Sequence, residues 1–572
     1  MRYMSMAIAL MLLPRLILSQ QDSLPKASLE GMVIAADTGV PVGGAEVLLV
    51  PSSIRPSGFL LPIRVSGPML QGVVQGAVSS RSNTEGRFAI RDVTPGLYRV
   101  MVTADGYARY ELGQRVVGMQ GTTISLAAGP VKTLELRLTP AGSISGQIFA
   151  PNGGAAVGVA VSLLQESYSE AGARIFRQEA SSLTNERGEY RLYWVTPGRY
   201  YLIAQNPPLA GSLSGRSLNI TRNNYAPTFY PGTADVAEGS LIEVKSGVEL
   251  TGANITMLAE RRYRVRGRVV DPLHGDRSIT VSVQSRTVTG GLLGGAASRA
   301  NAMDGSFVVE DVAPGAHLVT ARIQGGTDSW VSDFVPITVV NSDVDSVIVR
   351  LNSPTQIEGR VRVEGRELAS VQGIQNTRIS LVLADPNLPS NFYPVQFQSI
   401  RTDGTFEASS PLVGRYALRV SSVPAGFYVK EARSNLGDLL DSPIEFSGVN
   451  QVSLDILLSD KVGSVEGTLL SDKREPTTGA MIVLVPDQRL GRPDLYKVTQ
   501  TDQTGRFRFV DIAPNTYRLF AWEALEQHRY FDAKLLKQFE THGRPVRVGP
   551  SENLVIPEAK LISFQEVRAS GY

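Results

Sequence analysis

The chain of 572 residues contains no cysteine and only four histidines. The lack of cysteine excludes disulfides, thiolate nucleophiles, cysteine-ligated zinc and a lipidated cysteine anchor. No histidine belongs to an H-E-x-x-H pattern, and no G-x-S-x-G elbow, P-loop or dinucleotide fingerprint occurs. We therefore predict a non-catalytic protein without a cofactor or a metal site.

An excess of one charge is also missing, because 56 Lys and Arg residues balance 54 Asp and Glu residues. This balance argues against a nucleic-acid partner. The only long apolar run is N-terminal, where Arg2 precedes apolar residues 6–13 and Ser19 offers a small residue for cleavage. We predict a signal peptide over residues 1–19, with an uncleaved anchor as the alternative, and no other transmembrane span. The destination is then the periplasm, the outer-membrane surface or the medium.

One pattern occurs five times along the chain. A turn glycine is followed after two residues by an aromatic, and ten residues after the glycine a second turn precedes another ring. An Asn or Asp starts the first turn and glycine supplies its positive φ, while proline presets φ in most of the second turns. The first-turn glycines are Gly86, Gly188, Gly305, Gly404 and Gly505, and the second-turn glycines are Gly96, Gly198, Gly315 and Gly414, with Asn515 in the fifth copy.

Between these turns, apolar residues alternate with a period of two, which is typical of strands with one buried face. Each copy also opens with an apolar-x-Gly-x-apolar strand, centred on Gly31, Gly146, Gly267, Gly359 and Gly467. The fold class is therefore all-β, with five tandem Ig-like or transthyretin-like β-sandwiches over residues 27–139, 140–259, 260–352, 353–459 and 460–572. The short linkers favour a semi-rigid string of domains.

A short helix is predicted in the last sandwich. Asp532 can cap it, Leu535, Leu536 and Phe539 lie on it, and Gly543 can stop it. Such a helix could cover an exposed sheet edge.

With its pattern Gly-x-Val, Asp-x-x-Gly-x-Phe and Pro-Gly-x-Tyr, the chain resembles the carboxypeptidase regulatory-like domain family over nearly all of residues 27–559. The third copy departs from the pattern at His317 and the fourth at Val413. The resemblance implies a transthyretin-like β-sandwich and export, but no activity, because this domain is usually an accessory. It also implies carbohydrate binding as one possibility, since starch-binding domains share the fold superfamily.

Two groups of side chains have a chemical interpretation beside a structural one. Asn341, Asp343 and Asp345 alternate and could gather oxygens for Ca²⁺, or could simply be a hydrated strand end. Aromatic rings could stack on a sugar, or could pack loops and domain contacts. The candidates for carbohydrate stacking are Trp194, Tyr193, Phe229, Tyr230 and Trp330, whereas Trp522 follows a strand pattern that predicts core or domain-edge packing.

Three functions remain open at this point. The first is an exported binding, adhesion or scaffold protein that acts as a stalk or rod, with another cell-surface protein as partner. The second is a carbohydrate-binding protein with polysaccharide as partner. The third is an accessory part of a peptidase or of an outer-membrane uptake system. The oligomeric state is not predicted.

Overall fold

A computed structural model describes residues 26–52, 77–169, 172, 174–207, 224–270, 278–285, 295–323, 330–353, 355–384, 395–397, 399–410, 414–446, 451–471, 473–488, 491–526 and 528–570. The signal peptide predicted for residues 1–19 lies outside these ranges. Within them the chain is almost entirely β, and its strands form five sandwiches in sequence order. The predicted all-β fold of five tandem sandwiches is confirmed. Neither of the two described α-helices is a candidate membrane span.

Unit 1 shows the topology that the other units vary. Its outer sheet has the order β4-β1-β8, and its inner sheet has the order β3-β2-β5-β6 with β7 beside β5. Its strands are β1 (Ala27–Ala35), β2 (Glu46–Pro51), β3 (Val78–Arg81), β4 (Arg87–Val93), β5 (Gly96–Thr103), β6 (Tyr110–Glu111), β7 (Thr123–Leu126) and β8 (Val131–Leu138).

Units 2 and 3 enlarge this plan. Unit 2 contains β9 (Gly142–Phe149), β10 (Ala160–Tyr168), β11 (Arg174–Leu183), β12 (Glu189–Val195), β13 (Gly198–Gln205), β14 (Tyr225–Ala226), β15 (Thr228–Phe229), β16 (Leu241–Val244), β17 (Glu249–Leu250), β18 (Ile255–Thr256) and β19 (Leu258–Ala259). Unit 3 contains β20 (Tyr263–Val270), β21 (Ile279–Ser285), β22 (Gly295–Arg299), β23 (Ser306–Val312), β24 (Gly315–Ile323), β25 (Val331–Ser332), β26 (Val335–Val339) and β27 (Val344–Asn352). In unit 3, β25 pairs with both β24 and β27 and so joins the two sheets.

Units 4 and 5 complete the chain. Unit 4 contains β28 (Thr355–Val363), the 3-10 turns η1 (Leu368–Ser370) and η2 (Ile374–Asn376), β29 (Arg378–Leu383), β30 (Val395–Gln396), β31 (Thr405–Ser410), β32 (Arg415–Ser421), β33 (Tyr428–Ser434), β34 (Gly437–Asp438), β35 (Ile444–Glu445) and β36 (Gln451–Ser459). Unit 5 contains β37 (Gly463–Thr468), β38 (Met481–Pro486), η3 (Pro493–Leu495), β39 (Lys497–Gln500), β40 (Arg506–Ile512), β41 (Asn515–Trp522), η4 (Arg529–Phe531), α2 (Ala533–Gln538), η5 (Glu540–His542), β42 (Arg544–Val548), β43 (Asn553–Ile556), β44 (Leu561–Ile562) and α3 (Phe564–Ala569).

The opening strand of every unit lies between two partners. It pairs antiparallel with the strand after the first turn and parallel with a strand near the end of the unit, as β1 does with β4 and β8. The same arrangement holds for β9, β20, β28 and β37. In unit 5 the parallel partner is β43.

This register explains why glycine and an aromatic recur together. Gly31 lies directly opposite Phe88, and the other units repeat the pair. A Cβ on Gly31 would lie 2.0 Å from the carbonyl oxygen of Leu134, and one on Gly359 would lie 2.0 Å from the ring of Phe406. Only glycine therefore allows the ring to cover the opening strand at the centre of each core.

The second aromatic ring of the repeat stabilises the turn that precedes it. The hydroxyls of Tyr98, Tyr200 and Tyr517 each donate to the carbonyl four residues earlier, at 2.7–2.8 Å. In unit 3, Nε2 of His317 makes the equivalent contact with the carbonyl of Ala313 at 2.7 Å. His317 is buried, and this burial lowers its pKa. The histidine thus replaces tyrosine in a structural role.

The turn glycines differ between the two turns. Gly86, Gly188, Gly305, Gly404 and Gly505 all have φ between 72° and 85°. At the second turn, Gly315 and Gly414 have positive φ, with values of 124° and 94°, whereas Gly96 and Gly198 lie outside the left-handed region. The first turn therefore requires glycine in every copy, and the second does not.

The helix in unit 5 begins as predicted and ends differently. The carboxylate of Asp532 accepts from the amide of Lys534 at 2.9 Å and caps α2. Gly543 does not end the helix in a left-handed conformation, because η5 intervenes and the φ of Gly543 is −76°. A Cβ on Gly543 would instead lie 2.6 Å from the ring of Phe520. Close approach to this ring is therefore the reason for the glycine.

The helices of unit 5 cover a sheet face and not the predicted sheet edge. Leu535 and Leu536 of α2 and Val567 of the unpredicted helix α3 pack on Phe520 and Trp522 of β41. Trp522 is fully buried, in agreement with the predicted core packing. Unit 5 thus has a second apolar layer beside its sandwich core.

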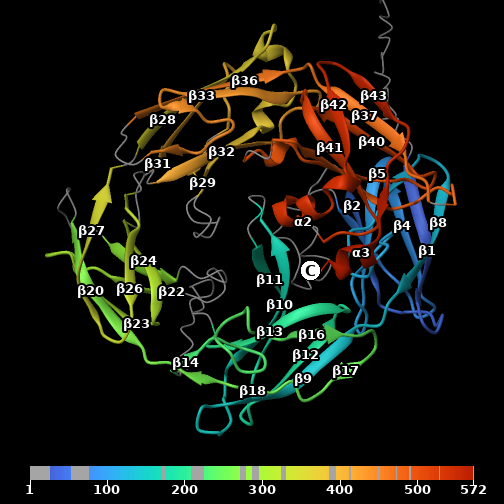
Figure 1. Cartoon of the computed structure of the whole chain (residues 1–572). Coiled ribbons are helices and arrows are strands. Elements are labelled where there is room, and N and C mark those ends of the chain that lie inside the picture. Colours follow the sequence, from blue (N-terminus) through green and yellow to red (C-terminus); the bar gives the residue numbers. More distant parts are fainter. Residues whose placement is uncertain are drawn as a thin grey trace, which may run out of the picture.

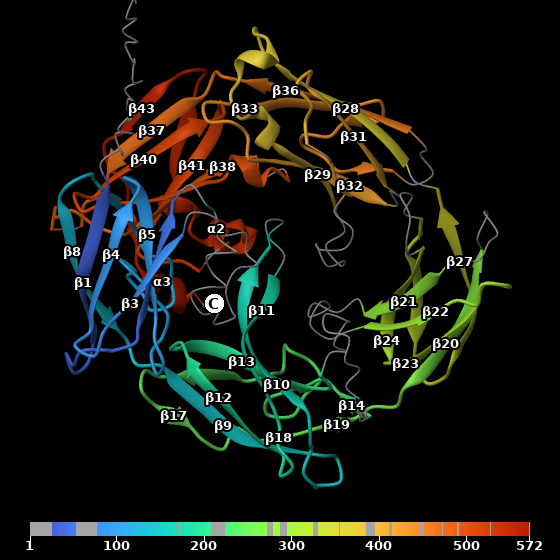
Figure 2. The same ribbon diagram turned by 180° about the vertical axis from the view of Figure 1, so that it is seen from behind.

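The five units do not extend as a string but follow one another around a ring (Figure 1). The sheets with β1, β9, β20, β28 and β37 lie on the outside, and those with β5, β13, β24, β32 and β41 face inward (Figures 1 and 2). Unit 5 consequently lies beside unit 1 as well as beside unit 4. The predicted semi-rigid string is therefore closed on itself.

Candidate functional site

A loop of unit 1 makes the contact that closes the ring. This clasp loop (residues 112–122) connects β6 to β7. Nη1 of Arg115 donates to the carbonyl of Thr478 at 2.8 Å, and its Nη2 lies 3.6 Å from the carboxylate of Glu523. The side-chain amide of Gln500 donates to the carbonyl of Gln120 at 3.2 Å. These contacts join residues more than 360 positions apart.

The clasp loop is held in shape from within unit 1. The carboxylate of Glu111 accepts from the amide of Gly121 at 3.0 Å and from Arg109 at 2.5 Å. The amide of Glu111 donates to the side chain of Gln114 at 3.2 Å. Glu111 is buried at the base of the loop. Contacts within unit 1 alone therefore hold the loop that carries Arg115 in the conformation that contacts unit 5.

Unit 2 meets unit 5 at two further points. The tip of the β10–β11 hairpin approaches η4 so closely that a Cβ on Gly172 would lie 2.6 Å from the carbonyl oxygen of Phe531. Arg568 of α3 lies 3.8 Å from Glu243 of β16. Tyr168 beside the tip has a raised pKa, mainly through burial and then through Glu166, to which its hydroxyl donates at 2.9 Å.

Between units 1, 2 and 5 lies a cleft of about 2000 Å³. Its walls include Leu48 and Met101 of unit 1, Tyr193 and Trp194 of unit 2, and Tyr496 and Tyr530 of unit 5. Side chains of both charges border it, among them Arg177 and Glu179, which pair at 2.7 Å. A cleft with apolar, polar and charged walls from three units is suited to a large ligand or a partner segment.

Trp194 occupies an unusual backbone position in this cleft. It lies at a β-bulge of β12 with φ of 55°, in the left-handed region. In three other units the equivalent position of the repeat is an aspartate with φ of 56–60°, namely Asp92, Asp311 and Asp511. Aspartate tolerates this conformation better than a bulky aromatic does, so unit 2 keeps Trp194 in spite of backbone strain.

The aromatic candidates for sugar stacking separate into two groups. Tyr193 and Trp194 are 56% and 43% exposed, their rings lie 6.3 Å apart, and the guanidinium of Arg191 lies 4.8 Å from the Tyr193 ring. Phe229 is only 2% exposed and packs in an inner cluster of unit 2. Tyr230 packs against the core of unit 2, and Trp330 packs against the core of unit 3. Only the first two rings offer a face to the cleft.

The alternating acidic residues before and in β27 are engaged in ion pairs. Arg266 lies 3.0 Å from Asp343 and 3.0 Å from Asp345, and the amide of Arg264 donates to Asp343 at 2.9 Å. These contacts lower the pKa of Asp343, with the amide of Arg264 as the largest cause. Within the described ranges, no group of three His, Asp or Glu side chains is arranged to hold a metal ion.

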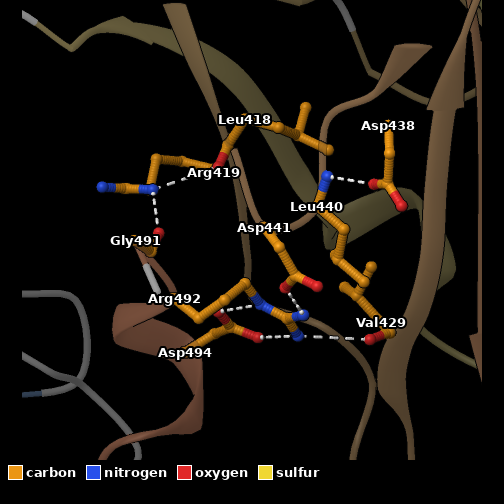
Figure 3. A network of polar contacts seen from close by, with 9 residues as sticks. All are labelled: Leu418, Arg419, Val429, Asp438, Leu440, Asp441, Gly491, Arg492 and Asp494. Atoms are coloured by element: carbon orange, nitrogen blue, oxygen red, sulfur yellow. Dashed lines mark hydrogen bonds and ion pairs between the residues drawn. The ribbon is translucent and has the colours of Figure 1, made fainter. Parts of the chain in front are cut away.

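The junction between units 4 and 5 is fastened by one buried arginine (Figure 3). Arg492 donates through two nitrogens to the carboxylate of Asp494, at 2.9 and 2.7 Å, and reaches Asp441 and the carbonyl of Val429 at 3.3 Å. Burial alone would lower the pKa of Arg492, but the bonds to Asp494 outweigh it and the pKa is raised. Arg419 adds a bond to the carbonyl of Gly491 at 2.9 Å.

The sequence pattern did not single out Arg115 or Arg492. Both lie outside the repeated turns, in segments whose partners belong to other units. The only local signal is Arg492 beside Pro493 and Asp494, since an Asp two residues later can accept a bidentate bond. Arg115 has no such local partner.

No protein-family model matches the chain, and no curated protein matches it. Among solved structures, a minor pilin of Streptococcus agalactiae is 12% identical with a TM-score of 0.22, over 41% of this chain and 97% of the pilin. A streptococcal ancillary pilin is 11% identical with a TM-score of 0.20, over 52% of this chain and 99% of the pilin. The major pilin subunit of Bacillus cereus is 10% identical with a TM-score of 0.14, over 73% of this chain and 99% of the subunit. At these values the likenesses carry no argument about function.

Proposed function

We propose that the chain is an exported, non-catalytic binding or scaffold protein whose closed ring presents the central cleft to a partner at the cell surface. The observation that carries the proposal is the closure itself, because the clasp loop joins unit 1 to unit 5 through Arg115. A stalk would keep its ends apart. We also propose that the five units belong to the carboxypeptidase regulatory-like family, and the repeat pattern supports this assignment.

A charge exchange at the clasp tests this function. Arg115→Glu removes the bond to Thr478 and places a second carboxylate beside Glu523, so it is expected to open the ring. The double variant Arg115→Glu with Glu523→Arg restores the ion pair but not the bond to Thr478, and it is expected to close the ring in part. Small-angle scattering reports the opening, and an array of cell-surface proteins and polysaccharides reports binding. Binding that falls in the single variant and returns in the double variant supports a ring-dependent cleft. Binding unaffected by opening, or a wild-type chain that is already extended, contradicts it.

Export requires a separate test. Cell fractionation and N-terminal sequencing of the purified chain should find it outside the cytoplasm, with an N-terminus near residue 20. Retention in the cytoplasm contradicts this part of the proposal.

A second candidate is polysaccharide binding on Tyr193 and Trp194. It is favoured by a specific observation, namely that Trp194 keeps an exposed ring at a strained position where other units have aspartate. Aromatic faces stack on the apolar faces of sugars. Pull-down with polysaccharides should lose binding in Trp194→Ala and Tyr193→Ala and keep it in Leu241→Ala, an aliphatic side chain in the same cleft. Equal loss in all three variants, or no binding by the intact chain, removes this candidate.

A further inference from the structure

Strand β11 is the edge of the inner sheet of unit 2, and it is unusually long. It has 10 residues, whereas the corresponding edge strands β3, β22, β30 and β39 have 4, 5, 2 and 4 in the described ranges. Proteins keep exposed edges short because a row of unpaired N–H and C=O groups can pair with another chain. An edge of this length inside a cleft therefore indicates a function.

The pairing with β10 determines which backbone groups are available. Beyond the end of β11, the amide of Thr184 donates to the carbonyl of Val159 at 2.9 Å. Bonded and non-bonded pairs alternate along an antiparallel ladder. Ser182 therefore also bonds to β10, whereas the N–H and C=O groups of Ser181 and Leu183 point away from it. In the part of the chain that the structure describes, no strand pairs with this side of β11.

This side of β11 faces the cleft. The three consecutive residues 180–182 all line it. Successive residues of a strand point to opposite faces, so all three border one space only where the strand edge itself faces that space. A bulge opposite Leu164 separates residues 180–183 from the first half of β11. Leu183, at the end of this run, is 59% exposed.

We propose that residues 180–183 of β11 bind an extended polypeptide segment of a partner protein by strand addition. The inference rests on the proposed function and names the partner class of the cleft. Outward N–H and C=O groups two residues apart match the backbone of another extended chain. The exposed side chain of Leu183 favours an apolar residue beside it in the docked segment.

The hairpin that carries this edge is also held in place. Its tip lies against η4 of unit 5 in the middle of the ring (Figure 1). Arg174 near the tip donates to Glu166 at 2.7 Å and lies 5.0 Å from the ring of Phe176. A partner strand would therefore meet an edge that is already ordered, which lowers the entropy lost on binding.

The test uses the full chain and a phage-displayed library of random twelve-residue peptides as probe. Selected peptides are synthesised and titrated against three chains: wild type, Ser181→Pro and Ser181→Ala. Proline removes the outward N–H of Ser181 without removing a backbone bond to β10. Both substitutions remove the hydroxyl, which accepts from that of Ser162 in β10 at 3.3 Å, so the alanine variant controls for this loss. We expect Ser181→Pro to weaken binding at least about tenfold and Ser181→Ala to change it less than about twofold.

Hydrogen exchange gives an independent readout. In the free chain the amides of Ser181 and Leu183 should exchange faster than those of Ala180 and Ser182, and a bound peptide should slow the first pair. Slow exchange at Ser181 and Leu183 in the free chain overturns the inference. So does a failure of any peptide to be enriched, or equal weakening by proline and alanine. If the ring-dependent binding described above persists in that case, the proposed function stands and only the strand-addition site is wrong.

Discussion

Unit 5 is held to its two neighbours in the ring by contacts of opposite character. At the junction with unit 4, Arg492 is 9% exposed and binds two carboxylates and a carbonyl. At the seam with unit 1, Arg115 and Glu523 are 30% and 33% exposed and lie 3.6 Å apart. The bidentate bond to Asp494 within unit 5 fixes the buried guanidinium that reaches Asp441 and the carbonyl of Val429 in unit 4. The hydrated pair of Arg115 and Glu523 contributes at most about 1 kcal/mol.

The difference follows from chain connectivity. Units 4 and 5 are joined by a linker only three residues long, residues 460–462. Units 1 and 5 meet only because the intervening units bring them together, which gives the seam a high effective concentration and lets weak contacts suffice. We therefore expect the seam to open under conditions that leave the junction intact.

The largest effect is expected at the junction. Arg492→Met removes the bonds to Asp494, Asp441 and Val429 and should destabilise the contact by about 2 kcal/mol. The loss is below that of a fully buried pair because both carboxylates are partly exposed and remain hydrated. Hydrogen exchange in β33 and η3 should accelerate about thirtyfold.

The matched control for this variant is Arg433→Met. Arg433 lies in β33, the strand whose Val429 accepts from Arg492, but its side chain is 71% exposed. Its exchange should stay within about twofold of wild type. If hydrogen exchange accelerates equally in the two variants, the bonds of the buried arginine do not account for the stability of the junction.

The junction and the seam also differ in how far a sequence can predict them. The pairing of Gly31 with Phe88 could be anticipated, because both residues belong to one repeated pattern and one pair of strands. His317 could be placed for the same reason, since it stands where other copies have tyrosine. The contact of Arg115 with Thr478 joins residues 363 positions apart, and it depends on the summed angles of four linkers. No local pattern encodes that sum, so a string was predicted where a ring forms.

The candidate site was predictable only in part. Tyr193 and Trp194 were among the five proposed aromatics, and both border the cleft. Composition could not separate them from Phe229, because burial of that ring depends on the pairing of β15, which carries it, with β13. The strained φ of Trp194 could be inferred only by aligning it with Asp92, Asp311 and Asp511, which hold the same bulge.

Acid should also weaken the junction between units 4 and 5. Glu364 of unit 4 accepts from Lys430 at 2.6 Å, from Ser459 at 2.6 Å and from Lys461 in the linker at 3.3 Å. These bonds, that of Lys430 first, lower its pKa to about 2 from an ordinary value of 4.5. The stabilisation is therefore complete above pH 4.5 and is lost as the pH falls toward 2.

Fluorescence transfer across the junction checks this titration. The chain has no cysteine, so Arg433→Cys and Arg508→Cys provide the only two labelling sites. Transfer should fall between pH 4.5 and 2 in the wild-type background and should be flat over this range in Glu364→Gln. If transfer still falls with pH in Glu364→Gln, another group causes the acid response.

A smaller effect is expected beside the seam, where Trp194 strains the backbone. Trp194→Asp restores the residue that units 1, 3 and 5 use at this bulge and should stabilise unit 2 by about 1 kcal/mol. The reverse exchange, Asp311→Trp in unit 3, should destabilise that unit by a similar amount. Hydrogen exchange in β12 and β23 measures both. A loss of stability in Trp194→Asp would mean that contacts of the indole outweigh the strain.

Salt should have the smallest effect, and it should weaken only the seam between units 1 and 5. The Debye length falls from about 10 Å at 0.1 M to about 3 Å at 1 M, so the hydrated pair of Arg115 and Glu523 is screened while the buried bonds of Arg492 are not. With labels at Thr84→Cys of unit 1 and Gln503→Cys of unit 5, transfer should fall as the ratio of closed to open rings drops about two- to fivefold. The labels across the junction should show no change. If both pairs of labels respond equally, the two contacts share one mechanism. If neither responds, packing of unit 5 on the clasp loop holds the ring closed without the ion pair, for example at Gly479, where a Cβ would lie 3.6 Å from the methyl of Thr122.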